Sequence, residues 1–304
     1  MRIGESSGTT ADSRSCGSNR RGPPESGRLL VTAVVPKRSQ DAAGAITASL
    51  DRLLGLGRDL REFYAVAAHD PRLLDLCARF RGLKPPRFAT AFEALVNAMA
   101  CQQVSLAAGI HLLNRLAERY GRSFGRGASR ICVLPHPEQL GRCRDDALRA
   151  LGFSRHKSQA IIELASALVH HGLDLEALQA VPDAGLVPWL RRLRTLRGVG
   201  PWTAEYTLLG GYGRLDSFPV DDVGGRNNLR RWLGITGPFG PTRARRALER
   251  WRPYRGLIYF HLLLDALDRA GHLRTPSPAD TSPTPEQAAS ALARSCPCTT
   301  RDHF

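Results

Sequence analysis

Hydrophobic residues recur every three or four positions along most of this chain, which is the spacing of helices that bury one face. From about residue 41 to residue 271 the pattern is punctuated by glycine, proline and capping residues, and it predicts about ten helices and an all-α fold. The predicted helices begin near residue 41, are broken at Gly55 and Gly57, and continue as 70–82, 89–101, 105–120, 157–171, 185–193, 201–211, 221 or 222 to 232, 242–251 and 254–270, with short helical pieces at 137–140, 145–151 and 173–180.

The two ends of the chain do not share this pattern. Residues 1–27 are rich in Gly, Ser, Arg and Pro, and residues 275–304 are rich in Pro, Ser, Thr and Ala, so both are expected to be disordered tails. Residues 29–35 form a β-branched run that predicts one strand, which needs a partner because a lone strand is unstable. The expected organisation is one domain over residues 28–274 with a tail at each end.

The composition adds a strong positive charge to this picture. Lys and Arg outnumber Asp and Glu by 43 to 28 in 304 residues, which gives a net charge of +15. Such a balance suits a polyanionic partner such as nucleic acid, and an arginine-rich solvated surface would explain it equally well.

Cysteine usage and hydropathy indicate the cellular compartment of the protein. Seven cysteines are scattered without a Cys-x-x-Cys pair, which indicates reduced thiols and argues against a zinc ribbon or an iron–sulfur cluster. No apolar run approaches the ~18 residues of a membrane span, and the first residues lack the apolar core of a signal peptide. We therefore expect a cytoplasmic protein with neither a membrane nor a metal partner.

The strongest chemical signal begins at a glycine turn. Gly198 and Gly200 flank Val199, and Pro201 stands where the next helix is expected to begin. Glycine allows a positive φ and a close approach of the backbone to a ligand, and the free amides at a helix start form an anion site. The turn could hold a DNA phosphate without reading sequence. An ordinary tight turn between two helices would also explain it.

Two adjacent acids, Asp221 and Asp222, open the helix that follows. The simplest explanation is that one of them is the N-cap of that helix. Their short distance from the glycine turn, and the stiff apolar residues 218–220 before them, favour an additional role. A carboxylate seated in such a partly desolvated place at a helix N-terminus stays ionised and can face a developing cation.

Together these features resemble the signature of the helix-hairpin-helix, Gly/Pro-rich loop and Asp superfamily of DNA glycosylases, and within it the 3-methyladenine DNA glycosylase II branch. The resemblance covers roughly residues 45–270 and implies two helical lobes with a central hairpin, the active cleft between the lobes, and the strand near residue 29 as a short β remnant. Besides residues 196–206 and the two acids, it rests on the motifs Phe92-Glu93-Ala94-Leu95-Val96, Gln102-Gln103-Val104-Ser105, Leu151-Gly152-Phe153-Ser154 with Lys157, and Trp251-Arg252-Pro253-Tyr254-Arg255.

The resemblance also implies how the acids act. Enzymes of this family flip a damaged nucleotide into a pocket, because the target bond is unreachable inside the duplex, and an Asp then stabilises the oxocarbenium-like sugar and helps to activate a water. Alignment without gaps from Asp216 to Arg226 places that acid at Asp222. Counting two residues on from Pro219 gives Asp221 instead, which stays as a supporting or alternative acid.

Trp202 stands where relatives with lyase activity carry the Lys that forms a Schiff base, and no Lys follows Lys157 in this chain. The resemblance therefore implies a monofunctional enzyme that hydrolyses the glycosidic bond and leaves the abasic site uncut. Trp202 could stack on an alkylated, cationic purine, and Tyr206 could line the same pocket. Packing between helices is the alternative explanation for both.

Other residues are implied to contact DNA. Gln103 stands where relatives insert a side chain into the gap left by the flipped base, and Arg226 would neutralise a phosphate unless it only forms part of a solvated face. The implied DNA-binding set is Gln103, Ser105, Gly198, Val199, Gly200, Thr203 and Arg226. No cofactor is expected apart from a monovalent cation at the hairpin, and we expect a monomer that binds damaged double-stranded DNA.

The sequence thus leads to the hypothesis of a base excision repair glycosylase for alkylated purines of the 3-methyladenine type. Two alternatives stay open. One is a helix-hairpin-helix protein that binds damaged or bent DNA without catalysis, and the other is a glycosylase for uracil, hypoxanthine or an oxidised purine.

Overall fold

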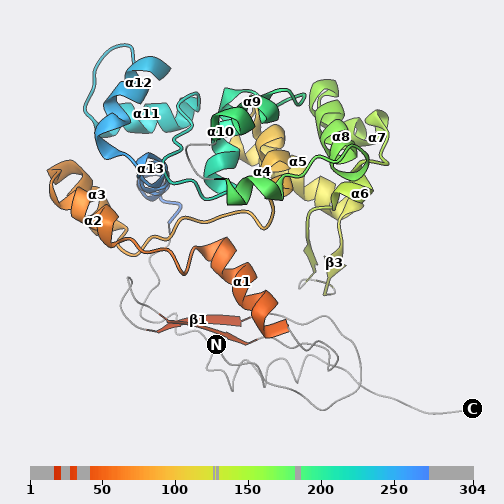
Figure 1. Ribbon diagram of the computed structural model, residues 1–304, viewed down its shortest axis with the longest axis horizontal. Coiled ribbons are helices and arrows are strands. Elements are labelled where there is room, and N and C mark those ends of the chain that lie inside the picture. The colour runs from red at the N-terminus through yellow and green to blue at the C-terminus, as the bar shows by residue number, and fades with distance from the viewer. Residues whose placement is uncertain are drawn as a thin grey trace, which may run out of the picture.

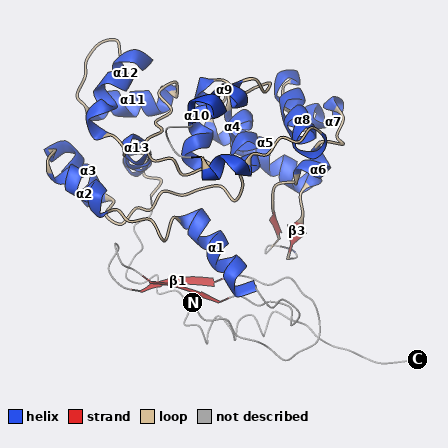
Figure 2. Cartoon of the chain, in the orientation of Figure 1, coloured by secondary structure: helices blue, strands red, loops and turns tan. Residues whose placement is uncertain are grey.

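A computed structural model describes residues 17–21, 28–32, 42–125, 127, 130–181 and 186–273. Helices dominate it, as the hydrophobic pattern predicts (Figure 2). In chain order the helices are α1 (Ala42–Leu54), α2 (Arg61–Ala68), α3 (Pro71–Arg79), α4 (Ala91–Cys101), α5 (Leu106–Tyr120), α6 (Pro137–Leu140), α7 (Asp145–Ala150), α8 (Arg155–His170), the 3₁₀ helix η2 (Glu176–Ala180), α9 (Leu186–Arg194), α10 (Pro201–Gly210), α11 (Val223–Trp232), α12 (Pro241–Leu248), the 3₁₀ helix η4 (Glu249–Trp251) and α13 (Arg255–Arg269).

Local capping chemistry sets many of these helix starts. The side-chain oxygens of Asp70, Thr90, Ser105 and Ser154 each accept a hydrogen bond from a backbone amide in the first turn of the helix that follows. Such a bond satisfies an amide that has no partner within the helix. The helix boundaries therefore lie close to those predicted from the sequence.

The N-terminal strand has a partner that the sequence did not reveal. Strand β2 (Arg28–Thr32) pairs antiparallel with β1 (Gly17–Arg21), with Gly17 opposite Thr32. The expectation of disorder is thus wrong for residues 17–21, because their backbone groups provide the hydrogen bonds that β2 needs. Residues 33–35 of the predicted strand, the rest of the first tail and the tail over 275–304 lie outside the described residues. A second short pair, β3 (Ser123–Phe124) with β4 (Ile131–Cys132), lies in the expected loop after α5.

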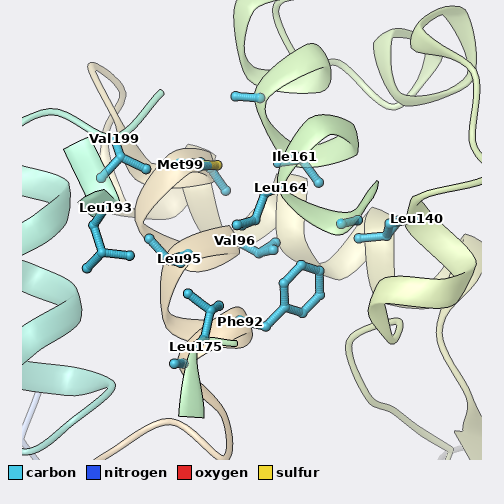
Figure 3. Packing of buried hydrophobic residues seen from close by; sticks show 14 of the residues in the cluster. Phe92, Leu95, Val96, Met99, Leu140, Ile161, Leu164, Leu175, Leu193 and Val199 are labelled. Carbon is cyan, nitrogen blue, oxygen red and sulfur yellow. The ribbon is translucent and has the colours of Figure 1, made fainter. Parts of the chain in front are cut away.

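The helices form two lobes, each around its own hydrophobic cluster. The central lobe comprises α4–α10 with η2, and Figure 3 shows α4 side chains such as Leu95 and Met99 packed with Ile161 and Leu164 of α8. The terminal lobe comprises α2 and α3 from the start of the domain packed with α11, α12 and α13 from its end (Figure 1).

Helix α10 belongs to both lobes. Its Leu208 is buried in the cluster of the central lobe, and the next residue, Leu209, is buried in that of the terminal lobe. Residues on this helix are therefore held where the two lobes meet. Within the described ranges, no helix combines the length and the apolarity needed to cross a membrane.

Candidate functional site

The turn between α9 and α10 uses its two glycines for different purposes. Gly198 has a φ of +76°, and a Cβ built on it would lie 2.8 Å from the Cβ of Ala160 in α8. Gly200 has a φ of −84°, and a Cβ there would meet nothing within 4 Å. Gly198 is thus required by the protein's own packing, whereas Gly200 keeps an open surface at the start of α10.

That open surface lies beside the first amides of the helix. Gly200 is the N-cap of α10, and the amide of Ala204 donates to its carbonyl at 3.0 Å. The amides of Trp202 and Thr203 come earlier, and an α-helix offers no internal partner to the amides of its first turn. Val199 is buried in the central lobe, so it could meet a phosphate only through its backbone.

Gln102 ties this turn to the loop between α4 and α5. Its Nε2 donates to the carbonyl of Gly198 and to Oγ1 of Thr203, both at 2.7 Å. Thr203 as a whole residue is 1% exposed, and its hydroxyl is bound by Gln102, so it offers almost no surface for the DNA contact expected of it. From the sequence, Gln102 is only a member of the loop motif, because no local pattern indicates a bond to a residue about a hundred positions away.

The same loop presents Gln103 on the surface in a strained conformation. Among the described residues other than glycine, Gln103 is the one with a positive φ, at 53°. This left-handed conformation costs a non-glycine residue about 1–2 kcal/mol. The neighbouring Val104 and Leu106 are 41% and 60% exposed. Ser105 caps α5 by accepting a hydrogen bond from the amide of Ala108 at 3.2 Å. The tip of the loop thus exposes apolar as well as polar groups beside the hairpin.

Asp222 is the N-cap of α11, and both of its carboxylate oxygens are held. Oδ1 accepts hydrogen bonds from the amides of Gly224 and Gly225 at 2.8 and 3.1 Å. Oδ2 accepts a hydrogen bond of 2.5 Å from the hydroxyl of Tyr259 in α13. The side chain is therefore fixed in one orientation at the start of a helix, where the helix dipole favours a negative charge.

Asp221 lies in a different environment. Its Oδ2 is 3.8 Å from the guanidinium of Arg245, and its side chain is 36% exposed. Arg245 also forms a closer ion pair with Glu205 of α10, at 3.1 Å. Burial raises the pKa of Glu205 above its usual value, and Arg245 opposes that shift. Asp221 is thus one member of a surface charge cluster.

Trp202 and Tyr206 form an aromatic pair on α10. Their rings stack with centroids 5.3 Å apart and planes 24° apart, and the Tyr206 hydroxyl donates to Oδ1 of Asn97 at 3.0 Å. Burial raises the pKa of Tyr206 well above its usual value, and the charge of Asp222 contributes to the shift. The charge of Asp222 thus reaches Tyr206, which lies on the helix that belongs to both lobes.

Arg226 points back into the protein. Its Nη1 donates to the carbonyl of Val220 at 2.7 Å, which braces the segment before the two acids. The described residues contain no group of three or more His, Cys, Asp or Glu side chains arranged to hold a metal ion.

Residues 96–253 match the family model described as HhH-GPD superfamily base excision DNA repair protein. The chain belongs to this superfamily. The matched region contains the hairpin, both acids and the Gln103 loop.

Two solved structures share the HhH-GPD fold with this chain. The 3-methyladenine DNA glycosylase from Archaeoglobus fulgidus aligns with a TM-score of 0.68 and 26% identity, over 81% of this chain and 80% of that one. The Schizosaccharomyces pombe 3-methyladenine DNA glycosylase in complex with abasic DNA aligns with a TM-score of 0.56 and 22% identity, over 69% and 97%.

Sequence relatives of this HhH-GPD protein include two bacterial enzymes. DNA-3-methyladenine glycosylase 2 of Escherichia coli is 34% identical over 181 residues, which is 60% of each chain. DNA-3-methyladenine glycosylase of Bacillus subtilis is 32% identical over 171 residues, which is 56% of this chain and 55% of that one. These alignments thus cover little more than half the length of the two relatives.

Proposed function

We propose that this protein is a monofunctional DNA glycosylase that flips an alkylated purine of the 3-methyladenine type out of double-stranded DNA and hydrolyses its glycosidic bond in base excision repair. The observation that carries the proposal is the Asp222 carboxylate, fixed through both oxygens at the start of α11; the Trp202–Tyr206 stack on α10 supplies an aromatic surface for the base. The similarity to 3-methyladenine glycosylases supports the choice of substrate.

The reaction requires a negative charge where Asp222 lies. The bond between C1′ of the sugar and the ring nitrogen breaks, and its electron pair leaves with the alkylated base, which becomes neutral. The sugar acquires oxocarbenium character, and a fixed carboxylate stabilises this charge without having to reorganise. The oxygen of a water then bonds to C1′, and its proton passes to Asp222 or to solvent.

The aromatic pair suits the departing base. An alkylated purine carries a positive charge, and the face of an aromatic ring attracts a cation more strongly once both are shielded from water. Burial raises the pKa of Tyr206, so its phenol stays neutral under assay conditions. We propose that Trp202 stacks on the base and that Tyr206, held by Asn97, supports Trp202 from behind.

The DNA contacts follow from the surface around this pair. Gly200 and the first amides of α10 would hold one phosphate, and Gln103 would enter the gap left by the flipped nucleotide. The strain at Gln103 is consistent with a loop that is shaped for a partner.

The direct test measures base release from methylated duplex DNA by purified wild type, Asp222→Asn and Asp221→Asn. We expect Asp222→Asn to slow release by about 100-fold or more, which is typical for loss of a preorganised electrostatic contact, while Asp221→Asn stays within roughly tenfold of wild type. Equal release by wild type and Asp222→Asn would refute the role of Asp222. If neither substitution slowed release, the mechanism would be wrong.

Two further measurements distinguish the alternatives. Borohydride trapping should give no covalent adduct, because Trp202 occupies the position of the Schiff-base Lys; a strong adduct would contradict a monofunctional enzyme. Salt-dependent DNA binding by wild type without release of any base from a panel of single defined lesions would support a non-catalytic binder instead.

A further inference from the structure

The Asp222 carboxylate is fixed by two parts of the chain. The start of α11 supplies the two amides that bind Oδ1, and α13 supplies the Tyr259 hydroxyl that binds Oδ2. The two oxygens of the planar carboxylate turn together about the Cβ–Cγ bond, and the N-cap engages only Oδ1. The hydrogen bond from α13 to Oδ2 is therefore a second anchor that restrains the same rotation.

Tyr259 has little freedom to move. It is 8% exposed, and its ring meets Phe218 edge to face, with centroids 5.2 Å apart and planes 86° apart. On the other side it lies against Gly225, where an added Cβ would be 2.6 Å from the Cε2 atom of the tyrosine ring. The absence of a side chain at position 225 thus allows Tyr259 to reach Asp222.

The hydroxyl of Tyr259 can act only as a donor to this carboxylate. Burial, together with the neighbouring charge of Asp222, raises the pKa of Tyr259 well above its usual value. The phenol therefore keeps its proton at the pH of a repair assay, and an ionised carboxylate can only accept. Hydrogen bonds to a charged group are also stronger than those between neutral groups.

We propose that Tyr259 is a positioning residue that holds Oδ2 of Asp222 toward the sugar of the flipped nucleotide. The inference rests on the proposed glycosylase function, which assigns the reaction to Asp222. Tyr259 acts through this carboxylate rather than on DNA, so its hydroxyl contributes to the rate of bond cleavage and not to the affinity for DNA.

The test compares Tyr259→Phe with wild type in single-turnover base release, at enzyme concentrations high enough to saturate the DNA. We expect the maximal rate to fall about 10- to 100-fold, the range for loss of one hydrogen bond to a charged group. The dissociation constant for the same duplex should stay within about twofold. A purely structural role would not produce this separation of rate from affinity.

Tyr212→Phe is the matched control. Tyr212 is also buried, and its hydroxyl donates to the carbonyl of Leu175 at 2.8 Å inside the central lobe. Both substitutions remove one buried hydroxyl, so both should lower the melting temperature by a similar amount, but only Tyr259→Phe should slow base release. A second variant, Gly225→Ala, keeps the hydroxyl and displaces the ring, and it should slow release in the same way.

The outcomes are distinguishable. If wild type releases no base from any lesion, the proposed function fails and the role of Tyr259 fails with it. If wild type is active and folded Tyr259→Phe has the same maximal rate, the inference about Tyr259 is wrong while the proposed function stands. A weaker affinity with an unchanged maximal rate, or equal slowing by Tyr212→Phe, would also overturn it.

Discussion

The two glycines of the hairpin allow folding and DNA binding to be separated experimentally. In Gly198→Ala, the new Cβ would lie 2.8 Å from the Cβ of Ala160, and the alanine would have to adopt a φ of +76°. In Gly200→Ala, the new Cβ would meet nothing within 4 Å of the protein, and the φ of −84° is ordinary for alanine. The same chemical change therefore meets a packed interior at one position and open space at the other.

The expected energies differ accordingly. The left-handed conformation costs alanine about 1–2 kcal/mol, and overpacking against Ala160 adds about 1–3 kcal/mol. Gly198→Ala should thus lose about 2–5 kcal/mol of unfolding free energy, or roughly 5–15 °C in melting temperature for a domain of this size. For Gly200→Ala, two small effects roughly cancel. Alanine lowers the entropy of the unfolded chain, which stabilises the fold, and it is a poorer N-cap than glycine, which destabilises it, so the unfolding free energy should stay within about 1 kcal/mol of wild type.

DNA binding should not follow the same order as stability. If a phosphate approaches the first amides of α10, the methyl group of Gly200→Ala occupies its path, and affinity should fall about tenfold or more in a fluorescence anisotropy titration with duplex DNA. A Gly200→Ala variant that melts like wild type and binds like wild type would refute a phosphate at this position. A Gly198→Ala variant with wild-type melting would refute the packing argument.

Three other predictions concern the neighbouring loop and the terminal lobe. Gln102→Ala removes both links to the hairpin and should lower the unfolding free energy by about 1–3 kcal/mol in a urea titration; no loss would mean that the links do not matter. Gln103→Gly relieves a positive φ and should raise the melting temperature by a few degrees, while slower base release would show that the side chain itself is used. Burial raises the pKa of Cys77 from 9.0 to about 12. Because the pKa of this thiol is higher in the folded state than in the unfolded state, the unfolding free energy is unaffected by the thiol below pH 9 and declines as the pH rises toward 12. In denaturant titrations over this pH range, Cys77→Ala should therefore reduce the decline in unfolding free energy.

The sequence predicts the helices well because the signals that bound them are local. Asp70, Thr90 and Ser105 each cap the helix that begins one residue later, and Pro201 begins α10 as proline at a first helical position should. Strand β1 cannot be predicted from the sequence, because its residues Gly-Ser-Asn-Arg-Arg carry no β signal. They form a strand only by pairing with β2.

The parts of the site that the sequence could not predict are contacts between distant segments. Tyr259 meets Asp222 across 37 positions, and Gln102 meets Thr203 across 101. Neither contact alters the hydrophobic period of a helix or the residues of a turn, so no short stretch of sequence indicates it. Tyr259 reads from the sequence as one more aromatic residue on a helix with a buried face, and only the packing of α13 on α11 makes it a neighbour of the acid.

The same geometry bears on which acid acts. From the sequence, an N-cap and a reactive carboxylate are competing roles for the two acids. Asp222 can fill both, because a cap requires only one oxygen, and Oδ1 alone accepts from the helix amides. Capping therefore orients the side chain and leaves Oδ2 for Tyr259 and, as we propose, for the sugar. Asp221 has neither constraint, since it is partly exposed and lies near an arginine that pairs more closely with Glu205. A charge that must be in place before a cation develops is better provided by the acid whose position is fixed, and this physical difference, independent of alignment register, favours Asp222.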